Sequence, residues 1–384
     1  MTRILHVAKT ALPFTFGGLE ETIRQINLSL APQDYTFDVA CAAADAMAPA
    51  ILATDHGRVY PRRTWLNVST CPVAPSLVRF LHRASYTYDV IHFHAVWPFA
   101  ELAEGVVHRG PAKRVVTYHA DVLGREPLNG LYRPWLRRFL ERSDRVVSTS
   151  DAYIDSSPVL ARLSRRPEVI PLGLSRQSYP PVDDQRVEAW RERIGEPLIL
   201  FVGALRPYKG LENLVEAVIG LPVQVAICGD GRMRDPLKAL IAARGASNVH
   251  LLGRVEDHDK AALLSAARAV ALPSTSRAEA FGIALLEGAM FGKPLISTEL
   301  GTGTSLVNVD CETGFVVPPG DIGALRRAID RLRDESLAAE FGRAAQARFQ
   351  ARFRSDLVAA RYAAVYSAVG PKVQETKTSD ALQT

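Results

Sequence analysis

Several signatures of other protein classes are missing from this sequence of 384 residues. No run approaches the ~20 apolar residues that a membrane-spanning helix needs, and the N-terminus lacks the pattern of a secretory signal peptide. The four cysteines are scattered and form no C-x-x-C pair, which argues against a zinc site and suits a reducing compartment. We therefore expect a cytoplasmic protein.

Two further absences narrow the function. The net charge is only +5, without clusters of lysine and arginine, so the composition does not indicate a nucleic-acid-binding protein. The loop after the first expected strand contains Gly17-Gly18 but does not match G-x-G-x-x-G, which argues against a dinucleotide-dependent dehydrogenase. This glycine pair could form a tight turn, or it could let the backbone approach an anion.

The order of the apolar segments predicts an α/β protein. A chain of this length is too long for one compact core and suits two domains. Short apolar runs alternate with helical patterns, which implies parallel sheets wrapped by helices, with ligands at the carboxyl ends of the strands. The expected strands cover residues 3–8, 36–40, 90–94, 114–117, 145–149, 168–170, 198–203, 223–228, 249–252 and 269–272.

Polar residues follow several strands of the first half. His92 and His94 end one strand, and without a third ligand in view we interpret them as a loop feature and not as a metal site. The segment 118–121 ends the next strand. There His119 and Asp121 could hold a substrate hydroxyl or accept a proton, although a single histidine is more often structural.

The segment 129–142 combines arginines and aromatic residues at helical spacing. Arg133, Arg137 and Arg138 recur among apolar side chains, as on helices that lie on a membrane surface. An ordinary domain helix with a solvated basic face fits the pattern equally well. The choice matters because a lipid-linked acceptor would require docking on an anionic leaflet.

Charged residues also stand at strand exits in the second half. Arg206 and Lys209 follow the strand 198–203, where they could bind a diphosphate or form a solvated basic turn. Asp257 and Asp259 form a D-x-D pair of the kind that holds a metal-bound diphosphate. Because they stand at the start of a helix, we interpret them as capping residues.

The most informative stretch is 274–294. A polar loop leads into a helix that is expected to begin near Phe281 and is apolar on nearly all sides, yet contains Glu287. A buried carboxylate needs a partner. Glu279 lies in the loop, and the helix N-terminus between the two carboxylates offers N–H groups and a positive dipole end to a phosphate. The spacing suggests a nucleotide-sugar cradle; a helix cap plus a satisfied core charge is the alternative.

Glu279 and Glu287, with Phe281-Gly282 between them, resemble the E-x7-E signature of the retaining GT-B glycosyltransferases of family 4. The resemblance extends to further motifs, namely Pro273-Ser274, Gly288, Gly292-Lys-Pro294 and residues 312–320. It implies two Rossmann-like domains that face each other across a deep cleft.

This resemblance also implies domain boundaries. Residues 1–172 are expected to bind the acceptor and residues 173–355 the donor nucleotide sugar. The helix 356–369 is expected to cross back to the first domain. The polar tail 370–384 is predicted to be disordered.

The family's motifs assign roles to matching residues. Glu279 is expected to orient the transferred sugar, His119 to contact it, and Glu287 to bind the ribose. Lys209 is expected to neutralise the diphosphate. The remaining donor contacts that the resemblance implies are Gly17, Gly18, Gly229, Gly231, Val255, Ala280, Phe281 and Gly282.

One position departs from the family pattern. The family loop reads V-G-R-L-x-x-x-K-G, and this sequence has Ala204 at the arginine position and Arg206 two residues later. We assign Arg206 as the replacement. No metal and no cofactor besides the nucleotide-sugar co-substrate is expected, because positive side chains and the helix dipole can neutralise a diphosphate.

Four further motifs narrow the range of expected substrates. Residues 16–20, 92–99, 156–160 and 301–305 resemble the mannosyl- and D-rhamnosyltransferases of bacterial O-polysaccharide assembly. This implies retaining transfer from a GDP-sugar to a saccharide on undecaprenyl diphosphate, on the inner leaflet of the bacterial inner membrane. The alternatives are a UDP-sugar transferase of another cell-surface polysaccharide, a GT-B epimerase, and a non-catalytic nucleotide-sugar-binding protein at the membrane.

Overall fold

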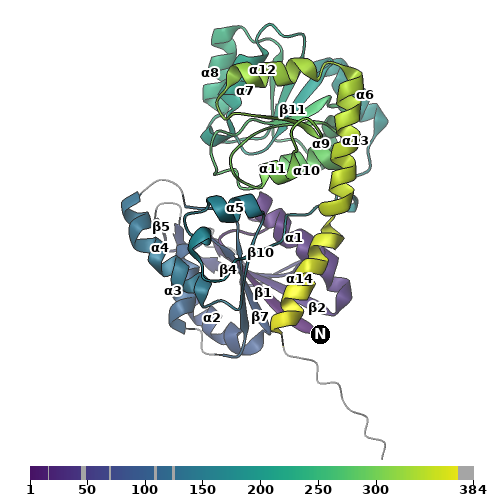
Figure 1. Ribbon diagram of the computed structural model, residues 1–384. Coiled ribbons are helices and arrows are strands. Elements are labelled where there is room, and N and C mark those ends of the chain that lie inside the picture. The colour runs from purple at the N-terminus through teal and green to yellow at the C-terminus, as the bar shows by residue number, and fades with distance from the viewer. Residues whose placement is uncertain (16, 45–48, 69–70, 108–109, 123–125, 371–384) are drawn as a thin grey trace, which may run out of the picture.

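The computed structural model of the chain describes residues 1–370 except residues 16, 45–48, 69–70, 108–109 and 123–125. Two α/β domains are stacked, and each is built around its own sheet (Figure 1). This is the predicted pair of Rossmann-like domains. From residue 371 onward, the tail for which we predict disorder lies outside the described residues.

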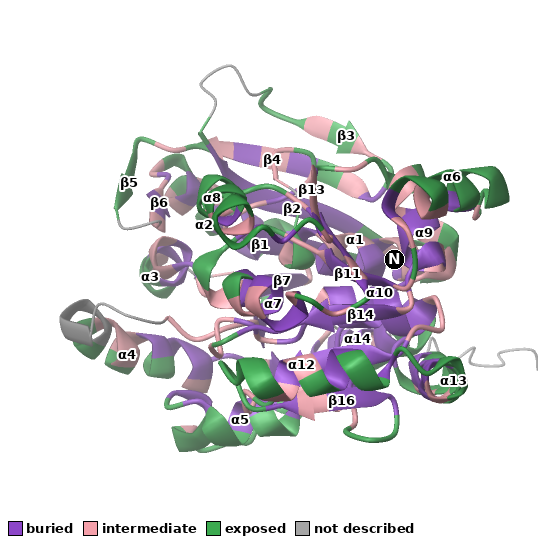
Figure 2. Ribbon diagram, turned by 90° about the horizontal axis from the view of Figure 1, so that it is seen from above, coloured by how far each residue is buried: buried purple, intermediate pink, exposed green. Residues whose placement is uncertain are grey.

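The first sheet has the strand order β10-β9-β8-β7-β1-β2-β4-β3. Its strands pair in parallel except β3, which is antiparallel to β4. The central strands are buried because helices cover both faces (Figure 2). The strands span Thr2–Ala8 (β1), Tyr35–Ala43 (β2), Leu52–Thr54 (β3), Gly57–Arg63 (β4), Val90–Ala95 (β7), Lys113–Tyr118 (β8), Arg145–Ser148 (β9) and Glu168–Val169 (β10), and a separate hairpin joins Leu66–Val68 (β5) to Cys71–Val73 (β6).

The second sheet is wholly parallel, in the order β13-β12-β11-β14-β15-β16. Its strands are short apolar runs, as expected for a parallel sheet that is covered on both faces. They span Leu198–Val202 (β11), Gln224–Cys228 (β12), Val249–Gly253 (β13), Ala269–Leu272 (β14), Leu295–Thr298 (β15) and Gly314–Val317 (β16). The carboxyl ends of β11, β12 and β14 therefore meet at one edge, where the predicted donor residues stand.

Helices connect the strands of both sheets. In the first domain they span Gly18–Leu30 (α1), Ser76–Thr87 (α2), Pro98–Val107 (α3), Glu126–Glu141 (α4) and Asp151–Ser156 (α5). In the second they span Asp184–Ile194 (α6), Leu211–Val218 (α7), Arg234–Arg244 (α8), Asp257–Ala266 (α9), Ile283–Met290 (α10), Thr304–Val307 (α11), Ile322–Arg331 (α12) and Glu335–Arg352 (α13).

The last helix, α14 (Ser355–Val369), leaves the second domain and packs on the first (Figure 1). Tyr362 and Tyr366 are fully buried against the first sheet together with Ile4 and Val90. The chain thus passes between the domains at two places. These are the segment around Leu174 and the start of α14, which are joined by a bridge between Leu174 and Arg354.

Candidate active site

Glu279 is held beside the exit of β11. Its Oε2 atom pairs with Nζ of Lys209, which ends a short 3₁₀ helix (Pro207–Lys209), and accepts a hydrogen bond of 3.1 Å from Ser274 Oγ. The Glu279 side chain is almost fully buried, so pairing with a cation removes most of the cost of burying its charge. Among the described residues Oε1 has no hydrogen-bond partner. This oxygen remains able to accept from a ligand hydroxyl.

Glu287 lies within α10 and has different partners from those of Glu279. The Tyr179 hydroxyl donates to Oε1 at 2.7 Å, and Lys260 Nζ lies 3.2 Å from the same oxygen. The prediction that this buried carboxylate needs a partner is confirmed. As with Glu279, the second carboxylate oxygen has no hydrogen-bond partner in the described part of the chain.

The N-terminus of α10 lies between the two carboxylates. The residue before the helix is Gly282, whose φ of +85° few other residues tolerate, and no side chain caps the first turn. A Cβ atom on Gly282 would stand 2.8 Å from Leu272 Cδ2. Glycine is therefore required here by both backbone and packing, and the first N–H groups of the helix stay available for an anion.

The predicted glycine loop of the first domain reaches this helix end. A Cβ on Gly18 would lie 2.9 Å from Ile283 Cδ1, the first residue of α10. A Cβ on Gly17 would lie 2.9 Å from Glu20 Oε2. The structure thus brings Gly17-Gly18 and the helix N-terminus together, although they are far apart in sequence and belong to different domains.

Two cations approach the same region from opposite domains. Arg206 is exposed, and within the described residues its side chain makes no hydrogen bond or ion pair. Lys9 follows β1 in the first domain. Burial lowers the pKa of the Lys9 ammonium; the Cys71 thiol opposes this shift, and the charge of Arg206 adds to it. Two like charges this close would gain from an anion between them.

His119 directly follows β8, as predicted, and is half-buried. Its Nε2 atom lies 2.9 Å from His94 Nδ1. Burial lowers the pKa of His119 to about 4, so the ring is neutral at pH 7. A neutral imidazole can accept or donate one hydrogen bond at its remaining nitrogen.

Asp121 does not pair with His119. Its carboxylate accepts from Tyr118, from Ser157 at 2.7 Å, and from Arg277 Nη2 at 2.9 Å. Arg277 belongs to the loop before α10, so this ion pair joins the two domains. Arg277 also donates to the backbone carbonyl of Ser156 at 2.9 Å, and sequence spacing gives no sign of either contact.

The other predicted donor contacts have structural roles of their own. Gly229 has a φ of +141°, and a Cβ there would lie 1.9 Å from the Gly203 carbonyl oxygen, so glycine is needed for two strand exits to meet. Gly231 similarly abuts Leu205. The Phe281 side chain is buried, 6.2 Å from the ring of Phe353, so only its backbone could face a nucleotide.

Val255 and Ala280 are half-buried. Val255 packs against the core of the second domain and Ala280 against that of the first. Ala280 therefore lies at the contact between the domains, and its carbonyl oxygen accepts from Gly303 N at 2.8 Å.

The interpretation of His92 and His94 as a loop feature is wrong. Both lie inside β7 and are buried, and His6 from the neighbouring strand β1 is close to them. Pairing between strands brought the third histidine to this place, and local spacing cannot show that.

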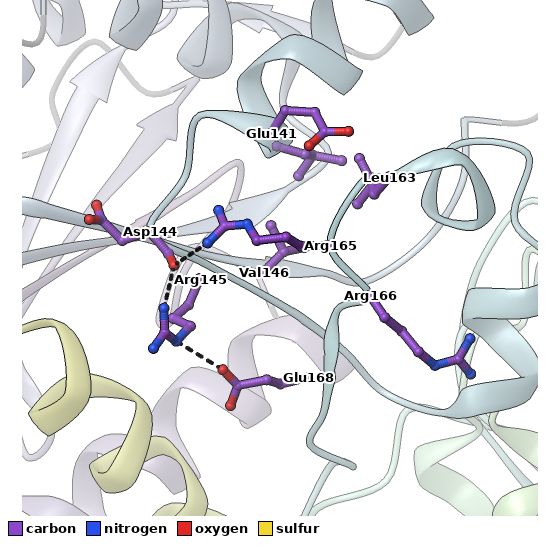
Figure 3. A pocket seen from close by; sticks show the side chains of 9 residues that line it. Glu141, Asp144, Arg145, Val146, Leu163, Arg165, Arg166 and Glu168 are labelled. Atoms are coloured by element: carbon purple, nitrogen blue, oxygen red, sulfur yellow. Dashed lines mark hydrogen bonds and ion pairs between the residues drawn. The ribbon is translucent and has the colours of Figure 1, made fainter.

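Two cavities lie in the first domain or at its boundary with the second. The larger, of about 170 Å³, lies by β9 and β10 and is lined by Arg145, Arg165 and Arg166 (Figure 3); no predicted site residue lines it. The smaller, of about 90 Å³, lies between α4 and the Asp121–Arg277 pair. It connects the arginine-rich helix with the boundary between the domains.

Lys260 and Tyr179 are the functional candidates that sequence reasoning missed. Lys260 is on α9 and Tyr179 lies in the segment between the domains. Each reaches Glu287 across a long stretch of chain. The sequence indicates that the buried Glu287 needs a partner, but it does not identify which residue that partner is.

Both domains match known protein families. Residues 16–177 match the family described as Glycosyltransferase Family 4, and residues 183–348 match the one described as Glycosyl transferases group 1. D-rhamnosyltransferase WbpZ of Pseudomonas aeruginosa is 41% identical, over 91% of this chain and 92% of its own length. O-antigen chain mannosyltransferase C of Escherichia coli is 36% identical, over 95% of this chain and 98% of its own length.

Solved structures share the architecture. Sucrose-phosphate synthase from Thermosynechococcus elongatus has a TM-score of 0.80 at 23% identity, over 96% of this chain and 99% of that one. The Anabaena protein HepE, in complex with UDP and glucose, has a TM-score of 0.77 at 22% identity, over 96% of this chain and 100% of that one. At these identities the likeness shows the fold alone.

Proposed function

Because the chain belongs to glycosyltransferase family 4, we propose that it transfers mannose or D-rhamnose from a GDP-sugar to a lipid-linked saccharide in O-antigen biosynthesis. The observation that carries this proposal is the pair of relatives above 35% identity that span over nine-tenths of the chain and are named for rhamnosyl and O-antigen mannosyl transfer. The acceptor is an undecaprenyl-diphosphate-linked saccharide.

The positive groups of the candidate donor site support transfer from a nucleotide diphosphate sugar. Lys209, Arg206, the N–H groups at α10 and the Gly17-Gly18 backbone surround one region, and all of them stabilise negative charge. They can therefore hold the diphosphate as its bond to the anomeric carbon breaks. These groups supply the positive charge that a metal ion supplies in other transferases, so the proposed reaction is metal-independent.

The two carboxylates orient the donor. Glu279 Oε1 accepts from hydroxyls of the sugar, and the second oxygen of Glu287 accepts from the ribose. His119, neutral at pH 7, contacts the transferred sugar from the first domain. The sugar is thus held from both sides of the cleft, which aligns its anomeric carbon with the acceptor.

The proposed stereochemical course is front-face retention. Retaining glycosidases place two carboxyl groups about 5 Å apart across the anomeric carbon. Here Glu287, which Lys260 and Tyr179 bind, is assigned to the ribose and not to the anomeric carbon. The acceptor hydroxyl oxygen bonds to the anomeric carbon on the face that the diphosphate leaves. Its proton passes to the departing phosphate oxygen.

A face of the first domain supports docking on an anionic membrane. In both views β5, α3 and α4 lie on the same side of the molecule (Figures 1 and 2). The exposed apolar side chains of these elements and of the residue before β5 are Trp65, Leu66, Val68, Leu102, Val106 and Leu131. The helix α4 also carries Arg137 and Arg138, and exposed apolar residues combined with positive charge are typical of proteins that bind anionic lipid. The described residues contain no helix that is long and apolar enough to cross a bilayer.

Charge reversal tests the docking. Arg137→Glu with Arg138→Glu should release the protein from phosphatidylglycerol vesicles in a sedimentation assay. Arg343→Glu with Arg352→Glu on α13 makes the same change in net charge on exposed residues of the second domain and should leave binding intact. Equal binding by both variants would favour an ordinary solvated basic face.

Thermal unfolding with free nucleotides tests the donor. GDP should raise the melting temperature more than UDP, because binding to the folded state alone raises stability in proportion to the logarithm of affinity. An equal or larger shift with UDP would instead support a UDP-sugar transferase of another cell-surface polysaccharide. Nucleotide binding without transfer from any donor would support a non-catalytic nucleotide-sugar-binding protein.

A further inference from the structure

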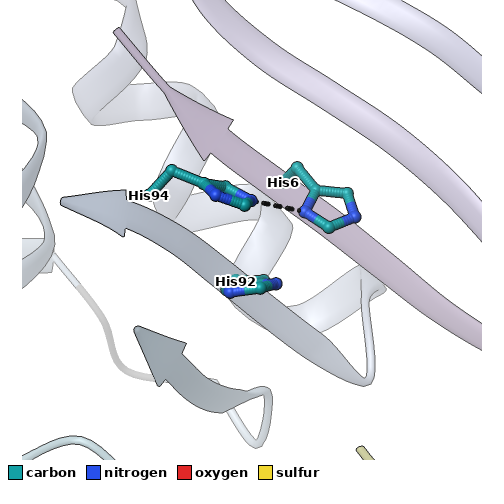
Figure 4. A group of neighbouring side chains, drawn as sticks. All are labelled: His6, His92 and His94. Carbon is teal, nitrogen blue, oxygen red and sulfur yellow. Dashed lines mark hydrogen bonds between the residues drawn. The ribbon is translucent and has the colours of Figure 1, made fainter. Parts of the chain in front are cut away.

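Three histidines form a cluster in the core of the first domain, near the carboxyl ends of β1 and β7. His6 on β1 stands opposite His92 on β7 in the strand register, and His94 is two residues further along β7. All three side chains are buried. Figure 4 shows the rings gathered between the two strands, with His6 and His94 bonded to each other. One ligand atom from each lies within 4.8 Å of the others.

The hydrogen bonds argue against a metal site here. His92 uses both ring nitrogens, Nδ1 with the Tyr366 hydroxyl and Nε2 with the Thr117 hydroxyl, each at 2.8 Å. His94 also uses both, one with His6 and one with His119. A cation could bind the three rings only by breaking these bonds.

The bonds instead form a chain that leads from His6 to His119, which follows β8. His6 Nδ1 lies 2.8 Å from His94 Nε2, and His94 Nδ1 lies 2.9 Å from His119 Nε2. Burial lowers the pKa of His6 to about 3 and that of His94 well below its usual value, so these rings are neutral. Each neutral ring carries one proton, and each bond needs one donor and one acceptor.

These requirements couple the three rings. If His6 carries its proton on Nε2, its Nδ1 must accept from His94 Nε2, and His94 Nδ1 must then accept from His119 Nε2. If His6 carries its proton on Nδ1, every bond reverses, and the proton of His119 moves to Nδ1. The chain therefore has two tautomeric states, and a group at the His6 end can select between them.

Asn27 of α1 is that group. It is fully buried, and its Nδ2 donates to the His56 carbonyl oxygen at 3.0 Å. A carbonyl oxygen can only accept a hydrogen bond, so the Asn27 side-chain nitrogen and oxygen cannot exchange places. Asn27 Oδ1 is therefore the atom that remains to accept from another group. Asn27 Oδ1 and His6 Nε2 are both buried, and neither has a hydrogen-bond partner among the described residues. The Asn27 side chain is near enough to His6 to raise the pKa of its ring, against the larger effect of burial. An acceptor there favours a proton on His6 Nε2.

We propose that Asn27 and His94 are positioning residues that hold His119 as the Nε2–H tautomer. His119 then presents the lone pair of Nδ1 as a hydrogen-bond acceptor. Its preferred ligand is a hydroxyl group of the bound sugar, a role that rests on the proposed transferase function. The structure gives Nδ1 of His119 no hydrogen-bond partner among the described residues, which leaves it free for this use.

The tautomer can be measured without substrate. Long-range ¹H–¹⁵N correlation on the ¹⁵N-histidine-labelled full chain distinguishes protonated from unprotonated ring nitrogens. In the wild type, His119 should be protonated on Nε2 and unprotonated on Nδ1. A proton on Nδ1 would overturn the proposal, as would stoichiometric zinc in the purified protein. Because neither readout depends on a donor, a failure here is separate from a failure of the proposed function.

A matched pair of variants tests the role of Asn27. Asn27→Leu removes the acceptor and should give His119 a mixture of tautomers, with kcat/KM for the donor lower by about five- to tenfold. Ser29→Leu introduces the same side chain at a half-buried position of the same helix and should keep the Nε2–H tautomer. If Asn27→Leu leaves the ¹⁵N pattern of His119 unchanged, Asn27 does not set the tautomer.

Discussion

The two carboxylates of the E-x7-E motif are both buried and paired, but with groups of different origin. Glu279 is bound by Lys209 and Ser274, which stand at strand exits beside the cleft. Glu287 is bound by Lys260 from α9 and by Tyr179 from the segment between the domains. In each case one oxygen takes a lysine and a hydroxyl, and the other has no partner among the described residues.

The different partners indicate different roles for Glu279 and Glu287, although both belong to one sequence motif. The Glu279–Lys209 pair lies near the α10 N-terminus and the glycine loop, where we propose that the bond to the sugar breaks. The Glu287–Lys260 pair is anchored to the joint between the domains and to the core. We therefore expect changes at Glu279 to act on the rate of transfer, and changes at Glu287 to act on donor affinity and stability.

The largest effect is expected for Glu279→Ala. It removes the sugar contact and the partner of Lys209, so kcat should fall by roughly 10² to 10³. Nucleotide binding should stay largely intact, measured as the thermal shift with GDP. Turnover close to that of the wild type would remove the sugar-orienting role of Glu279.

Lys260→Met should lower stability most. It leaves Glu287 buried with only Tyr179 as a partner, and an uncompensated buried carboxylate costs about 1–3 kcal/mol. Denaturant unfolding would measure the loss. Lys238→Met, on an exposed site of α8, is the matched control and should change stability little. If the two variants are equally stable, the Lys260 pair is not what keeps Glu287 charged in the core.

Glu287→Gln should weaken donor binding more than it slows transfer. The amide keeps the shape but loses a charged acceptor for the ribose, so KM should rise about tenfold with kcat nearly unchanged. Glu212→Gln, an exposed carboxylate on α7, should have no effect. A fall in kcat with an unchanged KM would indicate that Glu287 acts in the transfer step, and Glu279 and Glu287 would then not differ in role.

The smallest effect is the dependence of stability on pH. It comes from the buried, uncharged histidines and not from the paired charges. The pKa of His6 falls to about 3 on burial, so the unfolded chain binds a proton below its ordinary value of about 6.5, while the folded chain does not. Stability should therefore decrease as the pH falls from 6.5 toward 3, by about 1.4 kcal/mol at pH 5.5 from this residue. Unfolding of wild type and His6→Gln at pH 7.5 and 5.5 would show whether the decrease is smaller in the variant.

The sequence predicts much of the donor side of the site. The helix after Glu279 and the strand exit that carries Lys209 both follow from short, contiguous patterns. The same holds for the position of His119 after a strand. These features are local, because backbone conformation and strand order determine them within a few residues.

Contacts that form across the fold could not be predicted in this way. Lys260 and Tyr179 meet Glu287, and Arg277 meets Asp121, only through the packing of separate elements. His6 and His94 meet through strand pairing. The strands β3, β5 and β6 were missed because they have only three residues each, and β4 was missed because it contains Pro61.

The most direct test is a transfer assay with a panel of GDP- and UDP-sugars and a lipid-linked N-acetylglucosamine acceptor, in which wild type and Glu279→Ala are compared and the anomeric configuration of the product is determined. We predict transfer of mannose or D-rhamnose from the GDP-sugar with retained configuration, and loss of this transfer in the variant. Inverted configuration, or equal turnover by wild type and variant, would contradict the account.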